Sequence, residues 1–138
     1  MKQFNRESRD YKFIDKFEAG LVLTGAEAKS LRTQTAQFAN SKIDFNNKTP
    51  IISDLNIPLY KFSQGQEFET TRDRQLLLKE SEIAKLLSFK HQKYALIPIS
   101  IYSKNRFFKL EFGVGKKIKK YEKREIIKAR EFQKAHYA

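Results

Sequence analysis

A strand that leads directly into a capped helix is the feature that most constrains how this chain folds. It covers Phe17 to Arg32, which read FEAGLVLTGAEAKSLR. Apolar side chains alternate with other residues through the first half, as in a half-buried strand. Thr24 then has the position of a helix N-cap, and Glu27, three residues later, gives the spacing of a capping box. The sequence therefore predicts a strand, a corner at Gly25 and a helix.

The predicted helix runs from about Ala26 to Thr33. Helical spacing turns Ala28 and Leu31 inward, and it leaves Lys29 and Arg32 outward.

Further elements follow along the chain. Strands are expected over Tyr11–Leu23, Lys42–Phe45, Ile51–Leu59, Tyr94–Tyr102 and Phe107–Val114. A short buried run is expected over Leu76–Leu78 and a helix over Glu80–Ser88. The connections are a hairpin turn at Asn46–Lys48, a long loop over Lys61–Arg74 and a loop or frayed arm over Met1–Asp10. This order argues against a repeating βαβ unit. It favours a mainly β fold, an antiparallel sheet closed into a small barrel with short helices packed outside.

Length and composition indicate one globular domain. The chain has 138 residues, 40% of them hydrophobic, with 12 Phe and 6 Tyr to supply a core. It has no cysteine, hence no disulfide framework, and no run of about eighteen apolar residues that could span a membrane. The first residues lack the apolar stretch of a secretory signal. We expect a soluble, cytoplasmic protein.

The charge is large and uneven. The net charge is +12, and from Lys104 to Ala138 twelve basic and four acidic residues leave +8 in the last quarter. A field of this size favours polyanions such as nucleic acid. We therefore expect two parts: a barrel domain over 1–115 and a basic tail over 116–138, disordered or helical on binding.

No catalytic constellation is evident. His91 and His136 each lack a neighbouring ligand at metal-binding spacing. The stretch before Lys117 resembles a phosphate-binding loop but has Leu110 in place of its first glycine. We predict neither an enzyme nor a metal or cofactor site.

Several motifs together resemble one family. They resemble, in chain order, the signatures of the small protein B family, the SsrA-binding proteins that partner transfer-messenger RNA. The matching motifs are Asn5-Arg6 with Arg9, Glu18–Arg32, Arg72–Leu78, Leu96-Ile97-Pro98 and Tyr121–Glu125. The resemblance implies an oligonucleotide-binding (OB)-like β-barrel with flanking helices. It also implies binding to the transfer-RNA-like domain of transfer-messenger RNA and its delivery to stalled ribosomes in trans-translation, with the tail in the empty messenger channel and decoding centre.

The resemblance also implies site residues. RNA contacts are expected from Asn5, Arg9, Gly25, Glu27, Lys29, Arg32, Gln37, Arg72, Arg74, Gln75, Lys116 and Lys119. Decoding-centre contacts are expected from Tyr121, Glu122, Lys123, Arg124, Lys128 and Arg130. The expected partners are transfer-messenger RNA and the ribosomal RNA of the small subunit, bound by a monomer.

Three alternatives stay open at this point. Glu27 caps the helix, contacts RNA or does both. The protein acts as a generic barrel that binds transfer or ribosomal RNA without a rescue role. A ribonuclease that uses Glu27 or His91 as base is the least favoured, because no convergent acid–base pair stands out.

Overall fold

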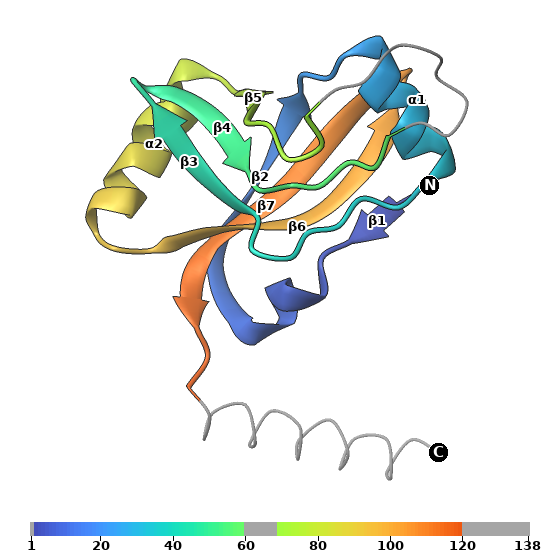
Figure 1. Cartoon of the computed structure of the whole chain (residues 1–138). Helices are drawn as coiled ribbons and strands as arrows, with labels where there is room; N and C mark the ends of the chain where they lie inside the picture. Colours follow the sequence, from blue (N-terminus) through green and yellow to red (C-terminus); the bar gives the residue numbers. More distant parts are fainter. Residues whose placement is uncertain (1, 60–68, 120–138) are drawn as a thin grey trace, which may run out of the picture.

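The computed structural model describes residues 2–59 and 69–119 (Figure 1). These ranges hold the strands β1 (Lys2–Phe4), β2 (Tyr11–Leu21), β3 (Lys42–Asn46), β4 (Thr49–Ser53), β5 (Arg74–Leu77), β6 (Ala95–Lys104) and β7 (Phe107–Lys117), the helices α1 (Gly25–Thr33) and α2 (Glu80–His91), and the 3-10 helix η1 (Arg6–Asp10). None of the helices in these ranges is long and apolar enough to cross a membrane.

The strands form one antiparallel sheet in the order β1-β6-β7-β2-β5-β4-β3. The sheet curls so that β3, at one edge, lies beside β6, and α1 and α2 lie at opposite ends (Figure 1). The antiparallel barrel with outside helices is thereby confirmed.

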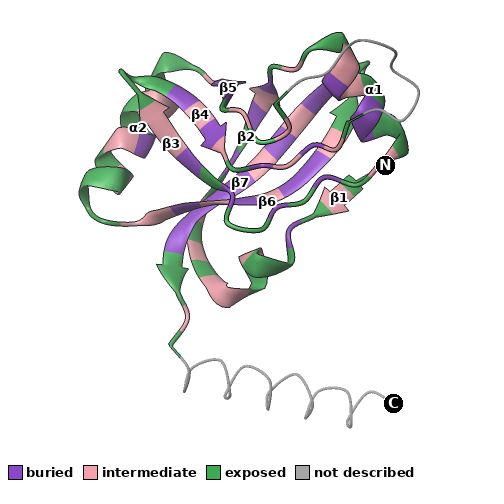
Figure 2. Cartoon of the chain, viewed as in Figure 1, coloured by how far each residue is buried: buried purple, intermediate pink, exposed green. Residues whose placement is uncertain are grey.

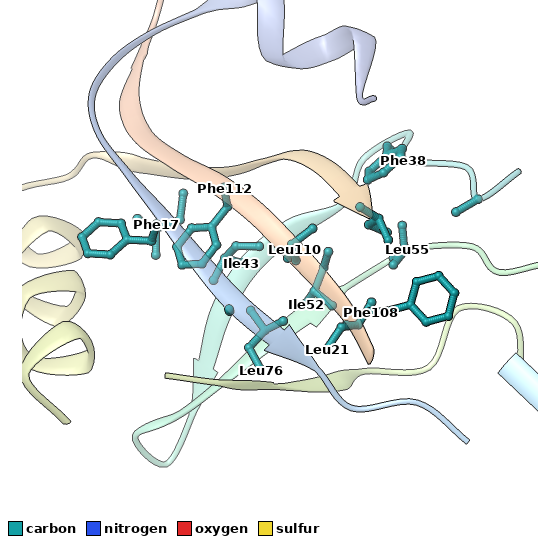
Figure 3. Packing of buried hydrophobic residues seen from close by; sticks show 14 of the residues in the cluster. Phe17, Leu21, Phe38, Ile43, Ile52, Leu55, Leu76, Phe108, Leu110 and Phe112 are labelled. Carbon is teal, nitrogen blue, oxygen red and sulfur yellow. The ribbon is translucent and has the colours of Figure 1, made fainter. Parts of the chain in front are cut away.

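The core lies inside the curled sheet. Buried and exposed residues alternate along the strands, as the period of two requires (Figure 2). Leu110 and Phe112 of β7, Ile52 of β4 and Leu76 of β5 are almost completely buried, and the Phe112 ring stacks on Phe17 at 5.7 Å between centroids (Figure 3). Four neighbouring strands, β7, β2, β5 and β4, thus contribute to one apolar cluster.

The N-terminal segment differs from the expected loop. It forms β1 and η1, and Asn5 between them is buried. The Asn5 Nδ2 donates to the Pro98 carbonyl oxygen at 2.8 Å, while its Oδ1 accepts from the Glu7 N–H at 3.1 Å. The partner lies 93 residues away, and for this reason local sequence patterns could not reveal it.

Other boundaries also differ. The strand predicted to reach Leu59 ends at Ser53, where Asp54 takes a positive φ of 59°. In the run Leu76–Leu78, Leu77 faces outward and is 58% exposed, because neighbouring residues of a strand point to opposite faces. Helix α2 continues to His91. Of the predicted loop, 61–68 lies outside the described residues, as do residues 120–138 of the predicted tail.

Beyond Gly115, which still pairs with Ala95 of β6, strands β2 and β7 continue as a short two-stranded ribbon of Tyr11-Lys12 and Lys116-Lys117. A bulge between Phe13 and Asp15 brings the ribbon backbones unusually close to each other. A Cβ placed on Gly115 would lie 2.1 Å from the Lys12 carbonyl oxygen. The ribbon can pair in this register only with glycine at 115.

We expect Gly115→Ala to lower the free energy of unfolding by about 2 kcal/mol, because the added methyl collides with backbone that cannot rotate away. Gly25→Ala is the matched control, since a Cβ there meets nothing within 4 Å. It should leave stability unchanged or raise it by up to about 1 kcal/mol. Urea denaturation of both variants measures this, and equal losses would contradict the close contact.

Candidate nucleic-acid interface

The corner between β2 and α1 forms the predicted capping box. The Glu27 N–H donates to Thr24 Oγ1 at 3.2 Å, and the Thr24 N–H donates to Glu27 Oε1 at 2.9 Å. Each group satisfies a backbone donor that the first helical turn leaves without a partner. Capping by Glu27 is therefore confirmed.

The same carboxylate also binds two arginines from the segment that leads into β5. Arg74 Nε donates to Glu27 Oε2 at 2.5 Å, and Arg72 donates from Nε to Oε2 at 3.1 Å and from Nη2 to Oε1 at 2.5 Å. The remaining Arg74 nitrogens bind the carbonyl oxygens of Leu55 and Thr70 at 2.6 and 2.9 Å. The carboxylate thus joins α1 to β5, and Arg74 extends the connection to the chain after β4.

Glu27 and Arg74 are completely buried, whereas the Arg72 side chain is 33% exposed. Burial by itself would raise the pKa of Glu27, but the hydrogen bonds from Arg72, the Thr24 N–H and Arg74 outweigh it and lower that pKa. The carboxylate is therefore charged at neutral pH, as a buried acid with two cationic partners should be.

Burial revises three of the expected RNA contacts, Glu27, Arg74 and Asn5. A direct contact of Glu27 or Arg74 with RNA does not fit a conformation in which neither side chain has an exposed surface. The exposed part of the cluster is Arg72. The buried Asn5 likewise serves the fold, because it caps η1 and holds Pro98.

The other predicted RNA-binding residues lie on the surface in several places. Lys29 and Arg32 project outward from α1, as expected, and Gly25 is exposed at its start. Gln75 faces outward on β5. Gln37 is exposed and pairs with Asn56 through backbone and side chains.

A second group lies at the far end of the barrel. Arg9 of η1, Lys116 at the end of β7 and Lys119 are exposed around the ribbon, where the Ile118 N–H donates to the Asp10 carbonyl oxygen at 2.8 Å. The structure thus joins Arg72 to α1 through Glu27 and places Gln75 beside the end of β2, whereas Lys116 and Lys119 lie near η1 at the end of β7. The predicted decoding-centre residues, 121–130, lie outside the described residues.

An apolar groove on the outer face of β5, β2 and β7 was missed by the sequence reasoning. It has a volume of about 570 Å³, and Val22, Leu77 and Phe107 line it together with Arg106 and Lys109. Phe107 is 72% exposed. Strand periodicity applied to the triple leucine would have found Leu77, since one of three consecutive residues on a half-buried strand must face outward.

A polar trio of Glu18, Lys109 and Tyr102 lies on the neighbouring strands β2, β7 and β6. Lys109 Nζ is 3.3 Å from Glu18 Oε1. A hydrogen bond from Tyr102 is the largest cause that lowers the pKa of Glu18, and burial together with Glu18 raises the pKa of Tyr102 to about 12. The outer face therefore combines an exposed aromatic ring, cations and a charged carboxylate. In the described residues, no three His, Cys, Asp or Glu side chains gather to hold a metal ion.

The Glu27 cluster makes stability depend on pH. The pKa of Glu27 is lower in the native protein than in the unfolded chain. The ionised side chain therefore contributes fully to the free energy of unfolding above its unfolded pKa of about 4.5, and this contribution is lost as the pH falls through the native pKa. We expect Glu27→Gln to cost about 3 kcal/mol at pH 7, and the difference from the wild type to shrink below pH 4.5.

Urea denaturation between pH 7 and pH 3 measures this difference. Glu82→Gln is the control, since Glu82 Oε1 accepts the Lys79 N–H at the start of α2 in the same way, but has no arginine hydrogen-bonded to it in the described residues. Its cost should be about 1 kcal/mol or less. Equal costs for the two variants would show that capping alone accounts for Glu27.

Comparisons with known proteins agree over nearly the whole chain. The family model described as SmpB protein matches residues 2–137. An SsrA-binding protein of Oceanobacillus iheyensis is 39% identical over 135 residues, covering 96% of this chain and 86% of the relative. An SsrA-binding protein of Thermosipho melanesiensis is 41% identical over 127 residues, covering 91% and 86%.

A solved structure of tmRNA-SmpB, from work on the bacterial ribosome, shares the fold with a TM-score of 0.73. It is 33% identical and covers 88% of this chain and 87% of its own. The OB-like barrel expected from the sequence is thus confirmed. The chain belongs to the SmpB protein family.

Proposed function

We propose that this protein binds the transfer-RNA-like domain of transfer-messenger RNA and delivers it to stalled ribosomes for trans-translation in the cytoplasm. The observation that carries the proposal is the family match over residues 2–137. The relatives' name, SsrA-binding protein, and the solved structure of tmRNA-SmpB support the same partners. The protein acts by binding RNA, and its role requires no catalysis.

The barrel supplies the RNA-binding surface in this proposal. The outer face of β5, β2 and β7 presents Phe107 and Leu77, on which unpaired bases can stack, beside the cations of Arg106 and Lys109. Basic side chains attract the phosphates without regard to sequence, whereas apolar and aromatic contacts select unstacked bases. A folded RNA loop fits this combination better than a regular duplex.

Glu27 contributes to RNA binding indirectly, by holding the Arg72 side chain in place. Its carboxylate holds the Arg72 guanidinium by two hydrogen bonds at the edge of the barrel, and the positive N-terminus of α1 lies beside the same carboxylate. Arg74 fixes this carboxylate from the interior. We assign Glu27 and Arg74 a positioning role, and assign contacts with RNA to Arg72, Gln75, Lys29 and Arg32.

The tail is the second functional part of the proposal. Residues 120–138 contain Tyr121, Lys123, Arg124, Lys128 and Arg130, which suit contacts with ribosomal RNA because arginine pairs with phosphate and stacks on bases. The ribbon of β2 and β7 leads the chain out of the barrel toward this segment. In this proposal the barrel binds the transfer-RNA-like domain, and the tail contacts the ribosome.

Removal of residues 120–138 should leave the affinity for the transfer-RNA-like domain within about threefold, because the barrel face and its cations remain in place. Peptide tagging on stalled ribosomes should be abolished. Filter binding and a reconstituted tagging reaction measure the two activities. A parallel loss of both would overturn the division into two parts.

A generic RNA-binding barrel is the alternative function, favoured only by the overall basic charge. Competition separates the two. Under our proposal, a 100-fold excess of transfer RNA should displace little of the bound transfer-RNA-like domain, because specific binding to nucleic acid is typically about a thousandfold or more tighter than non-specific binding. Displacement in proportion to concentration would favour the generic barrel.

A further inference from the structure

We propose that a polar hollow beside the apolar groove receives a single unpaired nucleobase of the bound RNA. The hollow lies between the β3–β4 hairpin and the segment that enters β5, and has a volume of about 510 Å³. Its walls include Val22, Asn46, Thr49, Ile51, Arg72 and Gln75. This inference rests on the proposed RNA-binding function and assigns one subsite within it.

The register of the strands builds the hollow. Asn46 lies opposite Thr49 across β3 and β4, and Ile51 lies opposite Gln75 across β4 and β5. Residues two apart in a strand point to the same face, so Thr49 and Ile51 face outward together. The Val22 N–H donates to the Gln75 carbonyl oxygen at 3.0 Å, which places the end of β2 beside β5. Four segments therefore converge on one outer face.

The side chains suit the edge of a base. Asn46 and Gln75 each carry an amide that both donates and accepts, and Thr49 adds a hydroxyl group. Such groups read the Watson–Crick or Hoogsteen edge of an unpaired base, and they carry no net charge. Val22 and Ile51 are partly exposed and provide an apolar surface for the ring.

Arg72 provides a fixed planar wall. Its Nε and Nη2 bind the Glu27 carboxylate at 3.1 and 2.5 Å, and its Nη1 donates to the Asp73 carbonyl oxygen at 3.2 Å. Because these hydrogen bonds lie in the plane of the guanidinium, they restrain its orientation and leave the flat faces for stacking. Guanidinium planes are one of the surfaces on which proteins stack unpaired RNA bases.

The charges favour a base over a phosphate. Glu27 and Asp73 together balance the positive charges of Arg72 and Arg74, and Asp73 itself lines the hollow. A phosphate would meet this carboxylate and find no uncompensated cation among the lining residues. A neutral base is not repelled by the Asp73 carboxylate, and it can form hydrogen bonds with the side-chain amides of Asn46 and Gln75.

The test uses the full-length protein and a transcript of the transfer-RNA-like domain. The variants are Asn46→Ala and Gln75→Ala, which leave the net charge unchanged. Asn47 is left unchanged because alanine would be strained at its positive φ of 49°. Gln92→Ala, on an exposed amide at the end of α2, is the matched control. Affinity is measured over a range of salt concentrations, and each RNA nucleotide is probed chemically for protection.

We expect each hollow variant to weaken binding about tenfold without changing the salt slope, because base contacts release no counterions. One unpaired nucleotide should lose protection, and Gln92→Ala should change nothing. Unchanged affinity and protection in both hollow variants would overturn the subsite, and so would a reduced salt slope, which indicates phosphate binding. If the wild-type protein fails to bind the transcript, the proposed function itself fails.

Discussion

The end of the barrel next to α1 depends on the hydrogen bonds and ion pairs of the Glu27 carboxylate. It closes the cap of α1 and holds Arg72 and Arg74, so a single buried charge joins the helix to the strand β5. A buried ion pair is a costly way to stabilise a fold, and well-packed apolar side chains often do as well. An apolar cluster, however, could not hold the Arg72 guanidinium in one orientation at the surface. The arrangement therefore suits recognition more than stability.

The sequence predicted the parts of this fold whose causes are local. The capping spacing of Thr24 and Glu27, the hairpin turn at 46–48 and the period of the core strands all depend on neighbouring residues, and the structure contains them. The order of strands and helices also led to the antiparallel barrel. The sequence did not reveal the burial of Asn5, or that Arg74 points inward, since their partners lie 93 and 47 residues away in the chain.

The same distinction explains the candidate site. The resemblance to the family suggested the basic residues Lys29, Arg32, Arg72 and Arg74 as RNA contacts, and in the structure Arg74 is buried. Exposed apolar residues look like core residues, so Phe107 and Leu77 were not found. Their exposure depends on which face of the sheet is covered, and no local pattern settles that. A resemblance to a family suggests which residues contact RNA, but only the three-dimensional arrangement separates contact from support.

The geometry of the ribbon links the barrel to the tail. Gly115 lies against the Lys12 backbone at the bulge, and the Ile118 N–H still donates to the Asp10 carbonyl oxygen at 2.8 Å beyond it. Backbone pairing between the two segments therefore persists almost to residue 120, and the basic stretch here contains no glycine that would loosen this pairing. The direction in which the chain leaves the barrel is set by backbone contacts rather than by tail composition. If barrel and tail bind different parts of one RNA–ribosome assembly, a fixed exit direction reduces the entropy that is lost when both bind together.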